Sequence, residues 1–162
     1  MSAEQTAPSH AAVDRVTAAL AAQGVEPRVV WFDDAVTTAQ LAADALGVEV
    51  GQIANSLVFD ADGVPLLVLT SGAHRVDTAK VAAALGVAKL KRATPEFVRR
   101  HTGQAIGGVA PVGHPKPVRT LVDTALAQYD NVWAAGGVPR AVFPITCAEL
   151  LRVTAGTATD VA

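Results

Sequence analysis

Apolar side chains recur along the chain at two periods, and each period predicts one kind of element. Val13, Val16 and Leu20 follow helical spacing within residues 10–23, and Gly24 comes next. This pattern predicts an amphipathic helix that ends at the glycine. Four more helices are expected from capping signals: one from the Thr37-x-x-Gln40 box to Gly47, one from Asp77 to Gly86, one opening at Thr94-Pro95, and one from the Thr146-x-x-Glu149 box to about Val153.

Runs of β-branched and aromatic residues between turn signals predict the strands. They lie at residues 28–32, 56–59, 65–70, 118–122, 132–135 and 141–145. The turn at residues 60–63 ends in Asp-Gly and predicts a hairpin with two largely buried strands. Because strands and helices alternate irregularly, the predicted fold class is α/β with a mixed sheet rather than a strict β-α-β series.

The length and composition bound the domain organisation. At 162 residues, with 51% hydrophobic and 17% charged residues, the chain can bury one full core. Residues 1–9 are small and polar and are expected to form a disordered tail, and residues 10–162 are expected to form a single domain. Aromatic residues make up only 4%, which argues against a module that stacks several RNA bases.

Charge and cysteine content restrict the partners and the compartment. A formal charge of −2 excludes a uniformly basic protein but allows a local positive face, for which the alternative is an ordinary solvated surface. The candidates for that face are Lys89, Lys91, Arg92, Arg99, Arg100 and His101. Cys147 is the only cysteine, so it is expected to be a buried structural thiol in a reducing compartment. The chain has no long apolar run and no signal peptide pattern, which predicts a cytoplasmic protein without a membrane partner.

The least regular stretch is residues 106–117, which we call the glycine loop. It contains three glycines and three prolines in twelve residues, so neither a helix nor a central strand can form there. The pair Gly107-Gly108 allows main-chain N–H groups to approach a carbonyl or oxyanion closely, while the prolines restrict the loop. A rigid surface connection between two strands is the alternative interpretation.

Known catalytic motifs are absent. The sequence contains no Gly-x-Ser-x-Gly, His-Glu-x-x-His, Walker or dinucleotide-binding pattern. Among the four histidines, His10, His74 and His101 fit polar surface positions, and only His114 falls within the glycine loop. None of them has the partner spacing of a metal site, so neither a metal nor a cofactor is expected.

Several segments together resemble the YbaK/ProX family of aminoacyl-tRNA deacylases, which are related to the editing insertion of bacterial prolyl-tRNA synthetases. In chain order these segments are residues 38–47, residues 52–59, Arg75-Val-Asp-Thr-Ala-Lys80, Thr102-Gly103, residues 106–114 and Trp133-Ala-Ala-Gly-Gly137. They extend over most of the chain between Val13 and Val153.

The resemblance implies a partly barrel-like sheet surrounded by helices, with a pocket for the aminoacyl-adenosine end of a mischarged tRNA. It also implies that Gly107 and Gly108 hold the ester carbonyl through their amides, while the substrate's own ribose hydroxyl activates water. The partners would be the acceptor end of a mischarged tRNA and, in addition, an aminoacyl-tRNA synthetase. The implied substrate-binding residues are Phe32, Thr38, Asn55, Pro111, His114, Ala135 and Gly136.

Four positions depart from the branch that acts on Cys-tRNA(Pro). Asn55 stands in place of a lysine, Phe32 of a tyrosine, Ala135 of a serine, and Val142 of an aspartate. Asn55 can bond a phosphate or a ribose without neutralising charge, or else simply bond nearby backbone at a strand start. The resemblance therefore implies a Cys/Ala-tRNA(Pro)-like deacylase without fixing the amino acid.

Three functional hypotheses follow from these observations. The first is a free-standing editing hydrolase. The second is a non-catalytic module that binds tRNA, a nucleotide or a protein, for which the four lost polar groups argue. The third is a hydrolase of another small acyl ester.

Overall fold

The computed structural model describes residues 10–162, so the tail predicted for residues 1–9 lies outside it. Within the described range the helices are α1 (Ala11–Ala22), α2 (Ala39–Leu46), α3 (Thr78–Leu85), α4 (Pro95–Thr102) and α5 (Cys147–Thr154), with short 3-10 helices η1 (Val50–Gln52) and η2 (Thr124–Gln128). The strands are β1 (Val30–Trp31), β2 (Ile53–Ala61), β3 (Val64–Ser71), β4 (Leu90–Arg92), β5 (Arg119–Asp123), β6 (Val132–Ala135), β7 (Ala141–Ile145) and β8 (Thr157–Thr159). None of the helices in this range is long and apolar enough to span a membrane.

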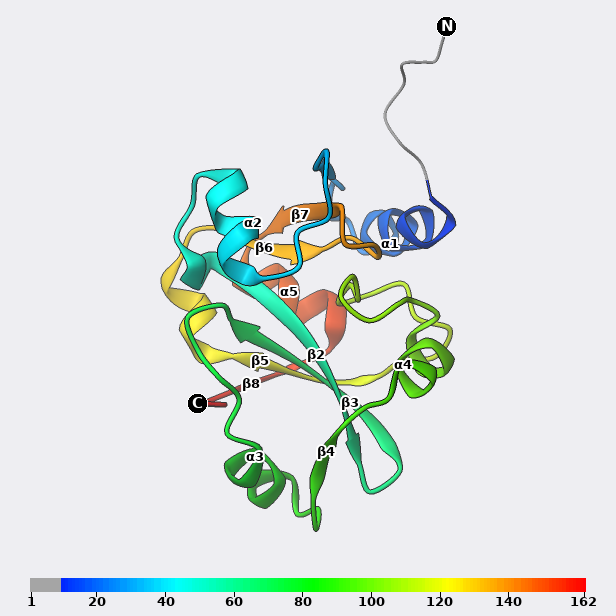
Figure 1. The fold of residues 1–162 in the computed structure, drawn as a ribbon, viewed down its shortest axis with the longest axis vertical. Coiled ribbons are helices and arrows are strands. Elements are labelled where there is room, and N and C mark those ends of the chain that lie inside the picture. Colours follow the sequence, from blue (N-terminus) through cyan, green and yellow to red (C-terminus); the bar gives the residue numbers. More distant parts are fainter. Residues whose placement is uncertain (1–9) are drawn as a thin grey trace, which may run out of the picture.

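The strands form one mixed sheet, as the irregular alternation of elements predicts. The order is β1-β7-β6-β2-β3-β5-β8, and β4 joins the far end of β2 (Figure 1). The hairpin β2–β3 and the pair β6–β7 are antiparallel, whereas β2–β6, β3–β5 and β5–β8 are parallel. The predicted α/β fold class with a mixed sheet is therefore confirmed.

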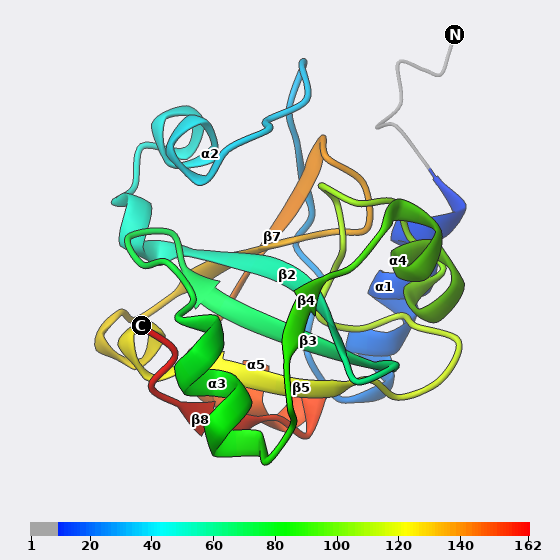
Figure 2. The ribbon, with the colours of Figure 1, turned by 60° about the horizontal axis from the view of Figure 1, so that its bottom comes forward.

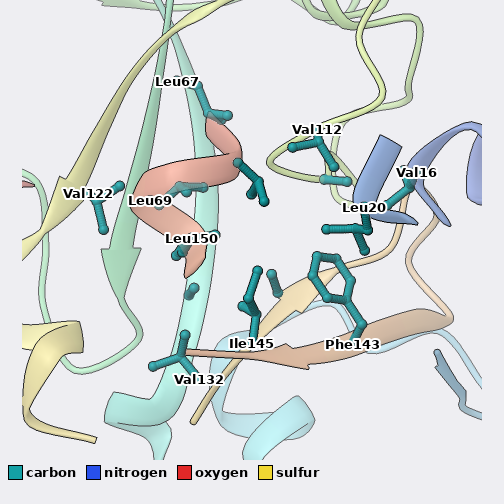
Figure 3. Packing of buried hydrophobic residues seen from close by; sticks show 14 of the residues in the cluster. Val16, Leu20, Leu67, Leu69, Val112, Val122, Val132, Phe143, Ile145 and Leu150 are labelled. Carbon is teal, nitrogen blue, oxygen red and sulfur yellow. The ribbon is translucent and has the colours of Figure 1, made fainter. Parts of the chain in front are cut away.

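The sheet curls around the main core. One cluster of buried residues takes Leu67 and Leu69 from β3, Val122 from β5, and Phe143 and Ile145 from β7 (Figure 3). Strands β5 and β7 are four steps apart along the sheet, which is about 19 Å if the sheet were flat. Their side chains share a cluster because the sheet bends into the partly barrel-like shape that the resemblance implies.

Helices cover both faces of this sheet. Helices α1, α4 and α5 pack on the inner cluster, while α2 and α3 pack on the opposite face (Figure 2). The central strand β3 shows the division, because Leu67 and Leu69 point to the inner cluster while Leu66 and Val68 point to the face of α3. With both faces covered, an almost continuous apolar strand is expected.

Most predicted helix boundaries are confirmed by the caps. The side chains of Asp77 and Thr94 accept hydrogen bonds from the first turns of α3 and α4, and the Thr146 box is complete at α5. The box predicted at Thr37 is wrong by one residue. Thr38 caps α2 by accepting from Leu41 N at 3.1 Å, which leaves Gln40 to bond Asp44 within the helix.

The predicted strands differ from the structure in three places. The run at residues 28–32 forms only the two-residue β1, because it pairs only with the first two residues of β7. Strands β4 and β8 were not predicted, since each is three residues long and β4 is dominated by Lys91 and Arg92. Strand β2 is only partly buried, unlike β3, and the open part of its edge turns out to border a cavity.

Candidate functional site

A cavity of about 650 Å³ opens where the pairing of β2 is interrupted. On one side β2 pairs with β3 from Ala54 to Ala61, but on the other side it pairs with β6 only at residues 53–54 and with β4 only at residues 59–61. Within the described part of the chain, residues 55–57 therefore have a strand partner only in β3, and all three line the cavity. The gap between β6 and β4 gives a ligand access to a strand edge.

The walls of the cavity come from four parts of the fold. They are the start of α2, the segment before α3, the glycine loop, and the β6–β7 pair. The ionisable side chains among the described lining residues are His74, Arg75 and Arg92, and no Asp or Glu is among those residues. This wall therefore suits a ligand that carries negative charge.

Gly107 lies at this cavity and has a main-chain amide that is not engaged by any of the described residues. The residue is exposed and lines the cavity, and no acceptor within residues 10–162 is hydrogen-bonded to its N–H. Its φ of +93° is one that side-chain-bearing residues rarely adopt. A Cβ built there would meet only Pro139 Cγ, at 4.0 Å, so a side chain at this position would have open space around it.

Gly108 has a different role from its neighbour. Its N–H donates to Ala105 O at 3.1 Å, so the amide is already engaged in a turn of the loop. The residue is buried, and a Cβ there would lie 2.5 Å from the carbonyl carbon of Val138 and 2.7 Å from Pro139 N. Gly108 is a glycine because the loop packs directly on the backbone that joins β6 to β7.

A buried side chain that the sequence analysis missed holds the glycine loop in shape. Gln104 is 2% exposed; its Oε1 accepts from Ala110 N at 2.7 Å and its Nε2 donates to Val112 O at 3.2 Å. Its own N–H donates to the hydroxyl of Thr102 at 3.1 Å. The only signal in the sequence was the position of Gln104 itself, an amide side chain between Gly103, where a helix ends, and the glycine loop.

His114 supports the same loop from within. Its Nε2–H donates to Ala110 O at 2.8 Å, and the side chain does not line the cavity. Burial lowers the pKa of His114 below its usual value of 6.5, and the bond to Ala110 opposes that shift only in part. A neutral imidazole that donates one hydrogen bond is a structural support. Pro111, in the same loop, is also buried.

Opposite the loop, strand register brings four polar residues together. Asn55 pairs with Thr70 across β2 and β3, and Thr70 lies beside Asp123 because Leu69 pairs with Val122. Since Leu69 and Val122 point into the inner cluster, Thr70 and Asp123 point to the face of α2 and α3. We call Asn55, Thr70, Asp123 and the adjoining His74 the polar row.

Asp123 is the centre of the polar row. It is 1% exposed, and its Oδ2 accepts from Ser71 N at 3.0 Å and from Thr70 Oγ1 at 3.3 Å, and lies 2.9 Å from His74 Nδ1. Its Oδ1 accepts from Ala125 N at 2.9 Å, which caps η2. His74 is exposed, as the predicted polar surface position implies, but the sequence did not predict that a buried carboxylate holds it at the cavity wall.

One buried hydroxyl at the cavity has no partner. Ser56 Oγ is buried and makes no hydrogen bond with any residue in the described range. Ser56 lies on the open edge of β2 and lines the cavity. An unpaired polar atom in such a place is ready to bond a ligand.

The structure divides the predicted site residues into two groups. Thr38, Asn55, Gly107 and Ala135 line the cavity together, and so does Val142. Gly108, Pro111, His114 and Gly136 are not on its surface, and Phe32 borders a separate hollow of about 570 Å³. Gly136 instead closes the β6–β7 turn, where its N–H donates to Ala141 O at 2.7 Å.

The side chains of the described residues do not form a metal site. No cluster of three or more His, Cys, Asp or Glu side chains with suitable placement occurs in residues 10–162. Cys147 is buried at the start of α5, and desolvation followed by the charge of Asp123 raises its pKa above the usual 9.0. It is therefore a structural thiol rather than a nucleophile.

Comparisons with known proteins give one family model. Residues 33–153 match the model of the aminoacyl-tRNA editing domain. This segment contains α2, β2, the polar row, the glycine loop and the β6–β7 pair, which are the parts that build the cavity.

Individual relatives are similar at different lengths. The uncharacterized protein YwhH of Bacillus subtilis is 30% identical over 126 residues, which covers 77% of this chain and 80% of that protein. A proline–tRNA ligase of Nitratidesulfovibrio vulgaris is 36% identical over 91 residues, but this match spans only 16% of the ligase. A crystal structure of a protein proposed to be a trans-editing enzyme for prolyl tRNA synthetase has a TM-score of 0.89 at 44% identity, covering 94% of this chain and 98% of that one.

Proposed function

Because the chain belongs to the family of aminoacyl-tRNA editing domains, we propose that it removes a small amino acid from a mischarged tRNA by hydrolysing the ester bond inside the cavity at β2. The match to the proline–tRNA ligase covers only a small part of that enzyme, so synthesis of prolyl-tRNA is not carried over. The protein would act as a separate hydrolase on the acceptor end of the tRNA. It would do so in the cytoplasm, with or without an aminoacyl-tRNA synthetase beside it.

The free amide of Gly107 is the observation that carries this proposal. An amide N–H that has no partner in the described protein, on a residue that lines the cavity, can donate to the ester carbonyl. As water attacks, negative charge develops on that oxygen, and a fixed donor is worth about 3–4 kcal/mol of transition-state stabilisation. Gly108 and Gln104 contribute by fixing the loop, so the proposal assigns the carbonyl contact to Gly107 alone.

The base in this proposal is the substrate. The described side chains that line the cavity include five hydroxyls but neither a cysteine nor a carboxylate. The free hydroxyl of the terminal ribose, which is next to the esterified oxygen, would accept a proton from the attacking water. The bond between the carbonyl carbon and the ribose oxygen then breaks, and that ribose oxygen takes up the proton.

The rest of the cavity suits an aminoacyl-nucleoside. Arg75 and Arg92 would attract the phosphates of the tRNA end, and Asn55 would position the terminal adenosine. Ala135 and Val142 leave an apolar wall for the amino acid, in place of the polar groups of the Cys-tRNA(Pro) branch. A small apolar side chain such as the methyl group of alanine fits this wall best.

Deacylation of a panel of mischarged tRNAs tests the proposal. We expect at least one tRNA charged with a small amino acid to be hydrolysed well above its spontaneous rate. The variant Gly107→Val should lower that rate by about 100- to 1,000-fold, because the side chain covers the amide and the backbone there is strained. Gly86→Val is the matched control, since Gly86 also has a positive φ of +71° and open space but lies at the end of α3.

Two results would contradict the proposal. One is binding of uncharged tRNA with no turnover of any charged form, which is the behaviour of a binding module. The other is a Gly107→Val protein that is as active as Gly86→Val.

A further inference from the structure

His74 is the one imidazole on the cavity wall within the described chain, and its environment defines which nitrogen carries the proton. Asp123 as a carboxylate can only accept hydrogen bonds, so the Nδ1 that lies 2.9 Å from it donates. In the neutral ring, Nε2 is then a bare acceptor. Nδ1 is engaged with the buried carboxylate, so Nε2, on the other side of the ring, is the nitrogen left for a ligand; the side chain as a whole is 37% exposed.

The bond to Asp123 is more than a surface ion pair. The same carboxylate also accepts from Ser71 N, Thr70 Oγ1 and Ala125 N, so its position is fixed from four directions. The backbone of His74 adds a further constraint, because its N–H donates to Ser71 O at 2.9 Å. The ring is therefore held in one orientation before any ligand arrives.

We propose that Nε2 of His74 accepts the hydrogen bond of the free ribose hydroxyl of the terminal nucleotide, and so turns that hydroxyl's lone pairs toward the attacking water. This inference rests on the proposed function. A hydroxyl has one proton and two lone pairs, so it accepts from water only while its own O–H is directed elsewhere. His74 supplies a fixed acceptor for that proton, which makes it a positioning residue rather than the base itself.

Its place in the sheet puts His74 on the nucleoside side of the cavity. Thr70 lies directly across from Asn55, with Cβ atoms about 5 Å apart in such pairs. Thr70 and His74 both bond the same oxygen of Asp123. His74 and Asn55 are therefore neighbours on one wall, where the proposed function places the terminal adenosine.

Other groups near this wall are less suited to the task. Arg75 and Arg92 are donors only, and the hydroxyls of Thr70 and Thr78 can donate as well as accept. The side chain of Asn55 also offers both an acceptor and donors. Only the His74 ring is set by a buried partner to act as an acceptor alone.

Equilibrium binding of an uncharged acceptor-stem minihelix tests this inference without any turnover. Three minihelices are compared, ending in adenosine, 2′-deoxyadenosine or 3′-deoxyadenosine. The wild-type protein should bind the ribose end about 3- to 10-fold more tightly than one of the two deoxy ends, as expected for one net hydrogen bond. In His74→Phe that ratio should fall below about twofold.

A matched control separates positioning from general damage. His101→Phe replaces another histidine, which stacks on Phe97 in α4 and does not line the cavity, and it should keep the wild-type ratio. A purely structural role for His74 would weaken binding of all three minihelices equally and leave the ratio unchanged, and that result would overturn the inference. So would a wild-type protein that does not distinguish the three ends.

A second measurement on the wild-type protein covers the case in which His74→Phe does not fold. The ¹⁵N resonance of His74 Nε2 should move upfield when the minihelix with the ribose end binds. It should not move when the minihelix with the more weakly bound deoxy end binds. An unmoved resonance with both ends would overturn the inference. If the protein deacylates a mischarged tRNA but the His74 test fails, the proposed function stands and only the role of His74 is contradicted. If deacylation fails, the binding and NMR measurements still show whether His74 contacts the ribose.

Discussion

The two sides of the cavity are built in opposite ways. The glycine loop offers a main-chain donor, and its shape is set by neighbours in sequence, namely Gly108, Gln104 and His114. The polar row offers side chains, and strand register brings them together from distant parts of the chain. The contrast teaches that the proposed contact with the acyl group depends on interactions close in the sequence, whereas the proposed contact with the nucleoside depends on the assembled sheet.

The largest effect is expected in the polar row. Asp123→Asn keeps the shape but places an amide NH₂ among buried donors, so stability should fall by about 3–4 kcal/mol. Urea unfolding measures it, with the exposed Asp130→Asn as a control expected to stay within about 0.5 kcal/mol. A loss below about 1 kcal/mol at Asp123 would mean that the row is not a cooperative unit.

An intermediate effect is expected in the glycine loop. Gln104→Leu keeps the volume but leaves Ala110 N–H and Val112 C=O buried without a partner, which should cost about 2–4 kcal/mol. Deacylation should fall as well, because the loop that presents Gly107 loses its support. Gln128→Leu, at an exposed amide, is the control for unfolding and activity. An active and stable Gln104→Leu protein would show that the glycine loop does not depend on Gln104 for its shape, and the contrast with the polar row would be lost.

The smallest effect is a pH dependence of the loop. The folded-state pKa of His114 is lowered, so below pH 6.5 the unfolded chain binds a proton that the folded chain resists. Stability should therefore decline as the pH falls from 6.5 toward the folded-state pKa, and not above 6.5. His114→Gln keeps a donor for Ala110 O but does not titrate, so thermal unfolding between pH 7 and pH 5 should change less than in the wild type. An equal decline in both proteins would show that His114 is not the source.

Local signals in the sequence were sufficient for the elements and for one side of the site. Asp77, Thr94 and Thr146 cap helices as their spacing predicts, and the glycine loop was recognised from its glycines and prolines. The difference between Gly107 and Gly108 was not accessible, because it depends on which of the two amides is bonded to Ala105 O in the folded loop. Spacing alone cannot tell a free amide from an engaged one.

The other side of the site could not be predicted. His74 and Asp123 share no motif, and their contact appears only when β3 and β5 pair in parallel and in one register. Strand β4 could not be predicted either, because it also depends on a pairing partner that is distant in the sequence. Its three residues read as a basic segment, and they become a strand only because the end of β2 offers an unpaired edge.

The most direct measurement is the amide resonance of Gly107 in the ¹⁵N-labelled protein. The ligand is a stable analogue in which alanine is joined to the terminal adenosine through an amide instead of an ester. On binding, the Gly107 amide proton should shift downfield and exchange more slowly with solvent, while Gly86 stays unchanged. If the analogue binds and the Gly107 amide neither shifts nor becomes protected, this amide does not hold the acyl group.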